Sequence, residues 1–201
     1  MGAKKVCTRM ISLLLCLLCG CAGADSDNDL TLELRSDFLS REGCSGVMEL
    51  TADYGQRVYT YTVDFSGTVK DGMTLVITAP EEVAGITASI REGQTCLEYD
   101  GVRLETGPVN ADGLSPLDAL PTFLTAMDSG YIAETGSERM GETEVLRICC
   151  RDPETEPGQG LETVLWFDKA QKTLRRGEVR SDGFTVIQCE FSAFILKQSN
   201  T

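Results

Sequence analysis

Three cysteines stand close together near the start of the chain, in the segment SLLLCLLCGCAG (residues 12–23). The spacing of Cys16, Cys19 and Cys21 could provide thiolates for a soft metal ion or a redox centre. Such a site also needs loops that bend the chain around the ion and hydrogen-bond partners that orient the thiolates. The flanking residues here are leucines, so we expect neither a metal site nor a cofactor.

The same segment has the organisation of a secretory signal. Lys4, Lys5 and Arg9 precede an apolar run from Met10 to Leu18, and small residues follow it. The run is too short for a permanent membrane-spanning helix, which needs about 20 apolar residues. We therefore predict a signal peptide at residues 1–20.

Within this signal, Leu18-Cys19-Gly20-Cys21 resembles the bacterial lipobox. The resemblance implies cleavage before Cys21, lipidation of its thiol with chains such as palmitate, and a chain held on the extracytoplasmic face of the cell membrane. Two or three acyl chains would hold it firmly, because each buried methylene contributes about 0.8 kcal/mol. An ordinary secreted protein cut nearby is the alternative.

Charge and composition exclude several functions. The chain has 201 residues, 18 of them basic and 31 acidic, for a net charge of −13. Cleavage before Cys21 removes Lys4, Lys5 and Arg9 but no acidic residue, which leaves a net charge of −16. Such a domain repels phosphate backbones, so we expect no nucleic-acid partner.

The chain contains no histidine, which removes Ser-His-Asp and Cys-His nucleophiles as well as His-containing zinc sites. We therefore predict that the protein is not an enzyme. A pair of carboxylates for glycoside chemistry stays open, but no spacing selects one. Glu81-Glu82 is most simply a solvated turn.

Five cysteines follow Cys21, so at most two disulfides form and one thiol is left over. They are Cys44, Cys96, Cys149, Cys150 and Cys189. Cys149 and Cys150 are neighbours in a strand-like run, so their side chains should point to opposite faces. Each cysteine is equally well explained as a small buried apolar residue.

The mature chain is long enough for one domain, which we place at residues 30–201. Residues 21–29 are small and acidic, and we predict a solvated tether between the lipid and this domain. The segment Leu30–Arg41 is predicted to be a short amphipathic helix, although its alternating leucines also permit a strand.

Most of the remaining sequence has the period of two that is typical of strands. Tyr59, Tyr61, Val63 and Phe65 alternate with polar residues, and Met73, Leu75 and Ile77 continue the pattern. Further strand-like runs are Ile86–Glu92, Thr95–Tyr99, Arg103–Thr106, Tyr131–Glu138, Glu144–Cys150, Glu162–Asp168, Thr173–Arg180 and Phe184–Phe194. Asp-Gly pairs at residues 71–72, 100–101 and 182–183 favour tight hairpins, so we expect an antiparallel meander.

The segment Ser115–Met127 departs from this pattern and predicts a helix. It has a cap-like serine, a proline in the first turn and apolar residues at helical spacing. We expect Pro121 to kink or split this helix. The default role of its apolar face is packing on the sheet.

Several motifs, taken in order, resemble the LolA-like (outer-membrane lipoprotein-sorting protein-like) family, in its branch of Gram-positive bacterial lipoproteins. They are DYGQRVYTYTVDF (53–65), Pro80-Glu81-Glu82 with Gly85-Ile86, LEYDG (97–101), LSPLDALP (114–121) and Leu165-Trp166-Phe167-Asp168 with Leu174. The resemblance covers most of the mature domain. It implies an α+β fold: a curved, incomplete antiparallel barrel whose concave side is covered by a few helices.

In that family the space between sheet and helices holds an acyl chain or a lipoprotein in some members. In others, of the GerS type, the fold resembles a scaffold for another envelope or spore protein. Cys21 would anchor this chain, so a shuttling carrier is disfavoured, and both a receptor for an apolar ligand and a non-catalytic scaffold remain. The residues expected on the apolar ligand or core face are Tyr59, Tyr61, Val63, Phe65, Leu75, Ile77, Leu117, Leu120, Phe123, Leu124, Met127 and Trp166. A sealed interior is the default expectation and an open cavity the alternative.

Overall fold

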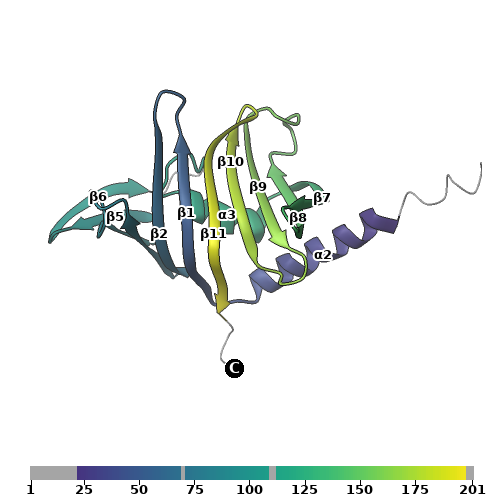
Figure 1. Cartoon of the computed structure of the whole chain (residues 1–201), viewed down its shortest axis with the longest axis horizontal. Helices are drawn as coiled ribbons and strands as arrows, with labels where there is room; N and C mark the ends of the chain where they lie inside the picture. Colours follow the sequence, from purple (N-terminus) through teal and green to yellow (C-terminus); the bar gives the residue numbers. More distant parts are fainter. Residues whose placement is uncertain (1–21, 69–70, 109–111, 198–201) are drawn as a thin grey trace, which may run out of the picture.

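The computed structural model of the chain describes residues 22–68, 71–108 and 112–197. Within these ranges it contains one eleven-stranded antiparallel sheet and the helices α2 (Ala22–Leu39) and α3 (Ala119–Ser129) (Figure 1). The strands are β1 (Gly43–Asp53), β2 (Val58–Thr68), β3 (Gly72–Ala79), β4 (Thr87–Arg91), β5 (Gln94–Tyr99), β6 (Val102–Pro108), β7 (Ile132–Met140), β8 (Thr143–Arg151), β9 (Leu161–Asp168), β10 (Leu174–Ser181) and β11 (Phe184–Lys197). The predicted curved, open antiparallel sheet with helical cover is confirmed.

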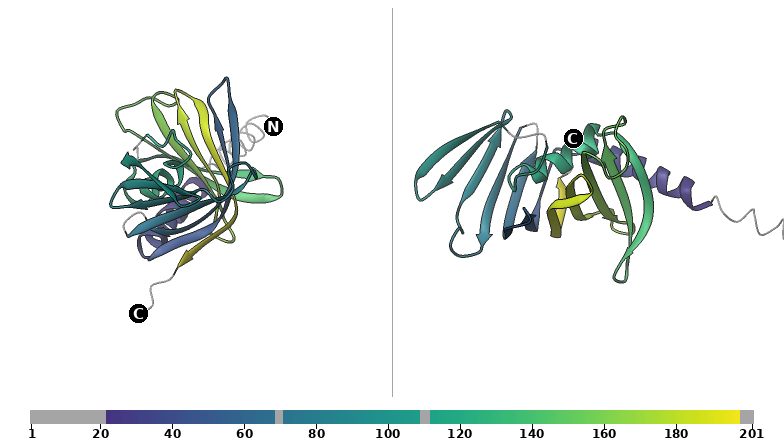
Figure 2. Two further views of the ribbon diagram at one scale, coloured as in Figure 1. Left: turned by 90° about the vertical axis from the view of Figure 1, so that its left-hand side faces the viewer. Right: turned by 90° about the horizontal axis from the view of Figure 1, so that it is seen from above.

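The sheet consists of two meanders joined at their first and last strands. Its order is β6-β5-β4-β3-β2-β1-β11-β10-β9-β8-β7, so β1 pairs with both β2 and β11. The sheet edges are therefore β6 and β7, and α3 connects them inside the curve (Figure 2). This topology places side chains of both meanders around α3.

The hairpin turns confirm the prediction at two of the three Asp-Gly pairs. Asp100 and Gly101 between β5 and β6 have φ angles of 48° and 75°, and Asp182 and Gly183 between β10 and β11 have 49° and 81°. Two consecutive positive φ angles are those of a type I′ turn, which matches the twist of the paired strands. At the third pair, Gly72 has a φ of 122° and is already the first residue of β3, so this pair does not form the same turn.

Helix α3 fills the centre of the concave side. Leu120, Phe123 and Met127 are buried there, as the apolar stripe predicted. The helix begins at Ala119, later than predicted, so Pro121 lies in its first turn. The prediction of a kink is wrong, because the N–H that proline lacks has no partner within the helix at this position.

Helix α2 is longer than predicted and is packed against the sheet. Its N-terminal part includes residues expected to form a solvated tether, but Asp27 is 8% exposed. Lys169 and Ser137 each donate a 2.8 Å hydrogen bond to the Asp27 carboxylate. Arg35 donates to carbonyl oxygens at the C-terminal end of α3, among them those of Met127 and Gly130. These contacts fix α2 to both the sheet and α3.

Strand β1 was not predicted, although it occupies the centre of the sheet. Its concave-facing residues Cys44, Met48, Leu50 and Ala52 are buried at every second position, with Gly46 completing the series. The sequence of β1 therefore has the period of two that is typical of a strand.

The five cysteines after Cys21 are all free thiols. As predicted, Cys149 and Cys150 face opposite sides of β8, because they belong to separate apolar clusters. Burial raises the pKa of Cys44 and of Cys150 to about 11, so these thiols are protonated and weakly reactive at neutral pH.

Candidate functional site

An apolar pocket of about 280 Å³ lies on the concave side of the first meander, where α3 does not reach. Its wall is the sheet from β1 to β5, and its cover is the segment that precedes α3. The lining residues are Leu50, Tyr61, Val63, Leu75, Ile77, Val83, Ile86, Ala88, Leu97, Ser115, Pro116 and Leu117. This described lining contains no charged side chain, so the pocket suits an uncharged, apolar occupant.

The pocket wall follows from strand register. Leu50 is opposite Tyr61 across β1 and β2, and Val63 is opposite Ile77 across β2 and β3. On the next strands Ala88 lies between Leu75 and Leu97. Since opposite residues in an antiparallel pair share a face, these side chains form one continuous apolar layer. The small Ala88 side chain leaves space in the middle of it.

The cover is held by short polar contacts. The Ser115 hydroxyl accepts a 3.3 Å hydrogen bond from the Leu117 N–H, and the Ser115 carbonyl accepts one of 3.0 Å from the Asp118 N–H. From the sheet side, the Tyr54 hydroxyl donates a 3.0 Å hydrogen bond to the Leu114 carbonyl. The cover is thus tied to the β1–β2 hairpin at one point.

Three tyrosines form a row beside this connection. The ring centroids of Tyr54 and Tyr59 are 6.3 Å apart, and those of Tyr59 and Tyr61 are 6.4 Å apart with nearly parallel planes. The pKa of Tyr54 is raised above its usual value, mainly because the hydroxyl is partly buried. The neighbouring Tyr61, Tyr59 and Asp118 side chains raise it further. The Tyr54 hydroxyl therefore stays protonated, and able to donate, throughout the neutral range.

The predicted apolar residues fall into several groups. Tyr61, Val63, Leu75, Ile77 and Leu117 line the pocket. Core residues around α3 form the second group: Phe65, Leu120, Phe123 and Met127. Tyr59, which is 38% exposed, lies in the tyrosine row beside Tyr61.

Leu124 lines a different cavity, of about 550 Å³, near the C-terminal end of α2. Arg41, Glu42, Asp71 and Asp128 also line that cavity, so it is less suited to an apolar occupant. The larger volume alone does not make it the better candidate.

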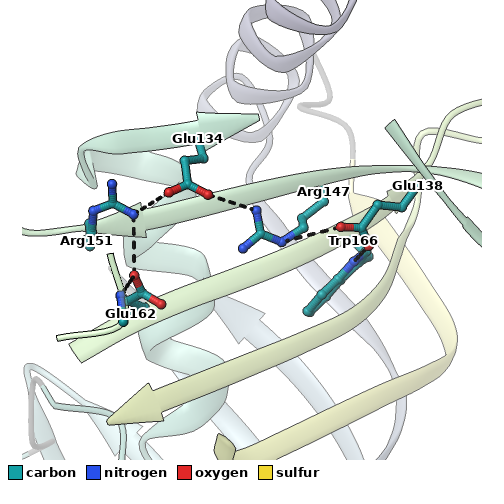
Figure 3. A network of polar contacts seen from close by, with 7 residues as sticks. Glu134, Glu138, Arg147, Arg151, Glu162 and Trp166 are labelled. Carbon is teal, nitrogen blue, oxygen red and sulfur yellow. Dashed lines mark hydrogen bonds and ion pairs between the residues drawn. The ribbon is translucent and has the colours of Figure 1, made fainter. Parts of the chain in front are cut away.

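The placement of Trp166 corrects the prediction, because its side chain lies on the convex face. It packs there with Val145 and Val164 in a second, smaller cluster. The indole Nε1 donates a 2.9 Å hydrogen bond to Glu138 (Figure 3), and the guanidinium of Arg176 lies 5.4 Å from the ring centroid. Trp166 therefore takes no part in the concave pocket.

A chain of ion pairs continues along this convex face (Figure 3). Arg147 contacts Glu134 at 3.3 Å and Glu138 at 3.7 Å, and Arg151 contacts Glu134 at 2.7 Å and Glu162 at 3.4 Å. The hydrogen bond from Arg151 lowers the pKa of the Glu134 carboxyl. The cations and carboxylates here are mutually paired, which favours a structural role for the network.

The sequence prediction missed seven lining residues, namely Leu50, Val83, Ile86, Ala88, Leu97, Ser115 and Pro116. Leu50 was missed together with β1. Ala88 and Leu97 lie on predicted strands. Ala88 is opposite Leu75 and Leu97 is opposite Ala88, so the strand pairing would have assigned both to the same face. Val83 lies within a turn, where no periodicity indicates the direction of a side chain. Ile86 begins the predicted run Ile86–Glu92, where it alternates with Ala88.

The described residues offer two negative observations. Neither helix in this part of the chain combines the length and apolar composition that a bilayer-spanning helix requires. The described His, Cys, Asp and Glu residues form no group of three or more that could bind a metal ion.

No protein-family model matches the sequence, and no curated protein matches it. Solved structures with a similar course of the chain include an uncharacterized conserved protein from Thermus thermophilus, which is 10% identical with a TM-score of 0.49 over 85% of this chain and 87% of that one. The LolA superfamily protein NE2245 from Nitrosomonas europaea is 9% identical, with a TM-score of 0.43 over 89% and 95% of the two chains. A chain in the complex of the CwlD amidase with the GerS lipoprotein from Clostridioides difficile is 12% identical, with a TM-score of 0.44 over 85% and 95%. At such low identity the likeness concerns the fold, and the function has to be argued from the site.

Proposed function

We propose that this protein is a non-catalytic, membrane-anchored lipoprotein that binds an apolar ligand, such as an acyl chain, beneath the Ser115–Leu117 cover. The observation that carries the proposal is the apolar pocket of about 280 Å³ with no charged side chain in its described lining. This volume is just below the range of about 300–1,000 Å³ typical of small-molecule sites, so it suits a single chain.

The surroundings of the pocket support an amphipathic ligand. Tyr54 and Tyr59 are 47% and 38% exposed and stand next to the pocket residue Tyr61. Tyrosine combines an apolar ring with a polar hydroxyl, which suits the boundary between a buried tail and a solvated end. A ligand with one apolar chain and a small polar end fits both features.

The anchor is proposed from the sequence, because Cys21 lies outside the described residues. Its support is the agreement of the basic start, the apolar run and the lipobox-like Leu18-Cys19-Gly20-Cys21. The anchored chain would lie on the extracytoplasmic face of the cell membrane.

The proposal can be tested with a substitution in the pocket wall that fills the pocket. Ala88 is 2% exposed and faces the pocket from β4, so the larger side chain of Ala88→Phe should occupy the space that a ligand would use. We expect calorimetric titration with 1-dodecanol, an uncharged single chain, to give saturable binding to the wild type and at least about tenfold weaker binding to the variant. Ala170→Phe is the control, because it adds the same ring at an exposed turn.

A folding defect would be recognised from the melting temperature. Since the new ring enters existing space, Ala88→Phe should melt no more than a few degrees below the wild type. Equal dodecanol binding by the wild type and a folded Ala88→Phe variant would contradict the proposal. A wild type that binds no dodecanol and yields no lipid by mass spectrometry would favour the protein-docking scaffold instead.

A further inference from the structure

Strand β6 forms an exposed edge of the sheet. Every residue from Val102 to Thr106 is exposed, and Val102 and Leu104 are 70% and 60% exposed. In Figure 1, β6 lies at one end of the molecule and α2 at the other, so neither helix covers this edge. The outer side of β6 has backbone groups without a strand partner, and such an edge can pair with another strand.

The two faces of β6 differ in chemistry. Leu104 is opposite Leu97, which lines the concave pocket, and Val102 is opposite Tyr99, so these residues belong to the concave face. Arg103 is opposite Glu98 and lies on the convex face with Glu105. Among the described residues, neither Arg103 nor Glu105 takes part in an ion pair.

The ends of the pairable segment are defined by the backbone. The Asp100-Gly101 turn precedes Val102. At the other end, the register shift between Glu105 and Gly107 leaves Thr106 without a paired residue on β5, and Pro108 cannot donate a backbone hydrogen bond. The regularly paired residues are therefore Val102–Glu105, which include Arg103, Leu104 and Glu105 in succession.

A second copy of this chain complements that segment. In an antiparallel pair of two identical strands that keeps each face continuous, the centre must fall on one residue and its equivalent in the partner copy. A centre at Arg103 would oppose two arginines, and a centre at Glu105 would oppose two glutamates. A centre at Leu104 places each Arg103 opposite a Glu105 on the convex face and the two leucines together on the concave face.

We propose that two copies of this chain associate through β6, antiparallel and centred on Leu104, so that one sheet continues across both. Opposite charges directly across a strand pair are favourable, and like charges are unfavourable. One edge strand buries less than the roughly 1,600 Å² of a standard interface, so this dimer is weak and depends on concentration. Because α2 lies at the far end of each copy, the pairing does not involve it.

The experiment exchanges the two charges. Sedimentation velocity of the full chain, over a range of concentrations at about 0.15 M salt, should show a monomer–dimer equilibrium. In a dimer of the Arg103→Glu variant, position 103 of each copy places a glutamate opposite Glu105 of the other copy. In a dimer of the Glu105→Arg variant, arginines face each other at the same two places. Each variant alone should raise the dissociation constant at least about tenfold.

Mixing the two variants provides the decisive measurement, because the acidic edge of one then faces the basic edge of the other. The mixture should form a heterodimer about as stable as the wild-type dimer. Arg139→Glu and Glu144→Arg are the matched controls, since they change net charge equally at an exposed ion pair between β7 and β8. These controls should leave the wild-type dissociation constant unchanged.

Three outcomes would overturn the proposal. The wild type could remain monomeric at every concentration, or the controls could weaken the dimer as much as the edge variants do. A wild-type dimer that Arg103→Glu does not weaken would show that the copies associate through another surface. The edge positions are exposed, so none of the variants removes a buried contact.

Discussion

At the scale of single residues, the contact between α3 and the sheet depends on one glycine. A Cβ atom built on Gly177 of β10 would lie 2.7 Å from Cε2 of the Phe123 ring. Phe123 is 1% exposed, and its ring also contacts Phe191, with centroids 6.4 Å apart. The ring therefore has little freedom to move away.

We expect Gly177→Ala to lower the free energy of unfolding by about 1–3 kcal/mol, because overpacking forces the Phe123 ring or the helix to shift. Urea denaturation would measure the change. Gly136→Ala on β7 is the control, since a Cβ there meets nothing within 4 Å, and it should change stability by less than about 1 kcal/mol. Equal stability of both variants would show that α3 adapts freely.

The sequence predicted such contacts unevenly. Alternation on β2 and β3 correctly grouped Tyr61, Val63 and Ile77 on one face. Alternation could not have placed Trp166, because Val164 to Asp168 on β9 are all buried and a strand buried on both faces shows no alternation. The pocket is the space that the side chains between the sheet and its cover leave unfilled. Its size depends on their packed volumes, and the periodicity of the sequence does not predict those volumes.

At the scale of elements, α2 illustrates a helix stabilised by tertiary contacts. Its first residues are small and acidic, and no local pattern predicted a helix there. Tertiary contacts hold this part of the helix in place. The Asp27 carboxylate accepts hydrogen bonds from Lys169 and Ser137, and the hydroxyls of Thr31 and Thr135 form a hydrogen bond of 2.8 Å. Most of the stability of helices in proteins comes from tertiary packing rather than from intrinsic propensity, so contacts of this kind decide where such a helix begins.

This contact predicts a pH dependence. The hydrogen bond from Lys169 lowers the pKa of Asp27 in the folded chain below its ordinary value of 3.8. The resulting stabilisation is present above the unfolded pKa and is lost as the pH falls through the lower, folded pKa. Asp27→Asn should therefore reduce stability at pH 7 by roughly 2 kcal/mol, and the difference from the wild type should shrink below about pH 4.

Urea titrations at several pH values would measure this difference. Asp29→Asn is the control, because Asp29 is exposed two residues further along α2, and it should leave the stability near that of the wild type. A stability gap between Asp27→Asn and the wild type that stays constant down to pH 3 would contradict the assignment.

At the scale of the whole molecule, the joining of the two meanders was the feature that local sequence could not supply. Strand β1 pairs with β11 over nearly its full length, with Leu50 opposite Cys189, although the partners are separated by most of the chain. Hairpins have turn signals, but a pairing between the first and last strands of the chain has none. The resemblance to a known half-barrel, rather than the residues alone, predicted that the sheet would curve around helices.

The packing of α2 also changes how an anchored chain would sit on its membrane. Ala22 directly follows Cys21 and is five residues from Asp27, which is about 8 Å along a helix. A lipid on Cys21 would therefore hold the acidic domain close to the bilayer instead of on a long flexible spacer. Anionic headgroups repel a domain with a net charge of −16, so its attachment should depend on the lipid alone.

Replacing the anchor residue tests this dependence. We expect Cys21→Ser to lose all label from radioactive palmitate and to move from the membrane fraction to the soluble fraction, because the remaining surface offers no compensating attraction. Cys19→Ser should keep both the label and the membrane association, since it changes a neighbouring thiol without removing the proposed acceptor. Retention of Cys21→Ser in the membrane fraction without label would mean that another part of the chain binds the bilayer. Retained label would place the lipid on a different residue.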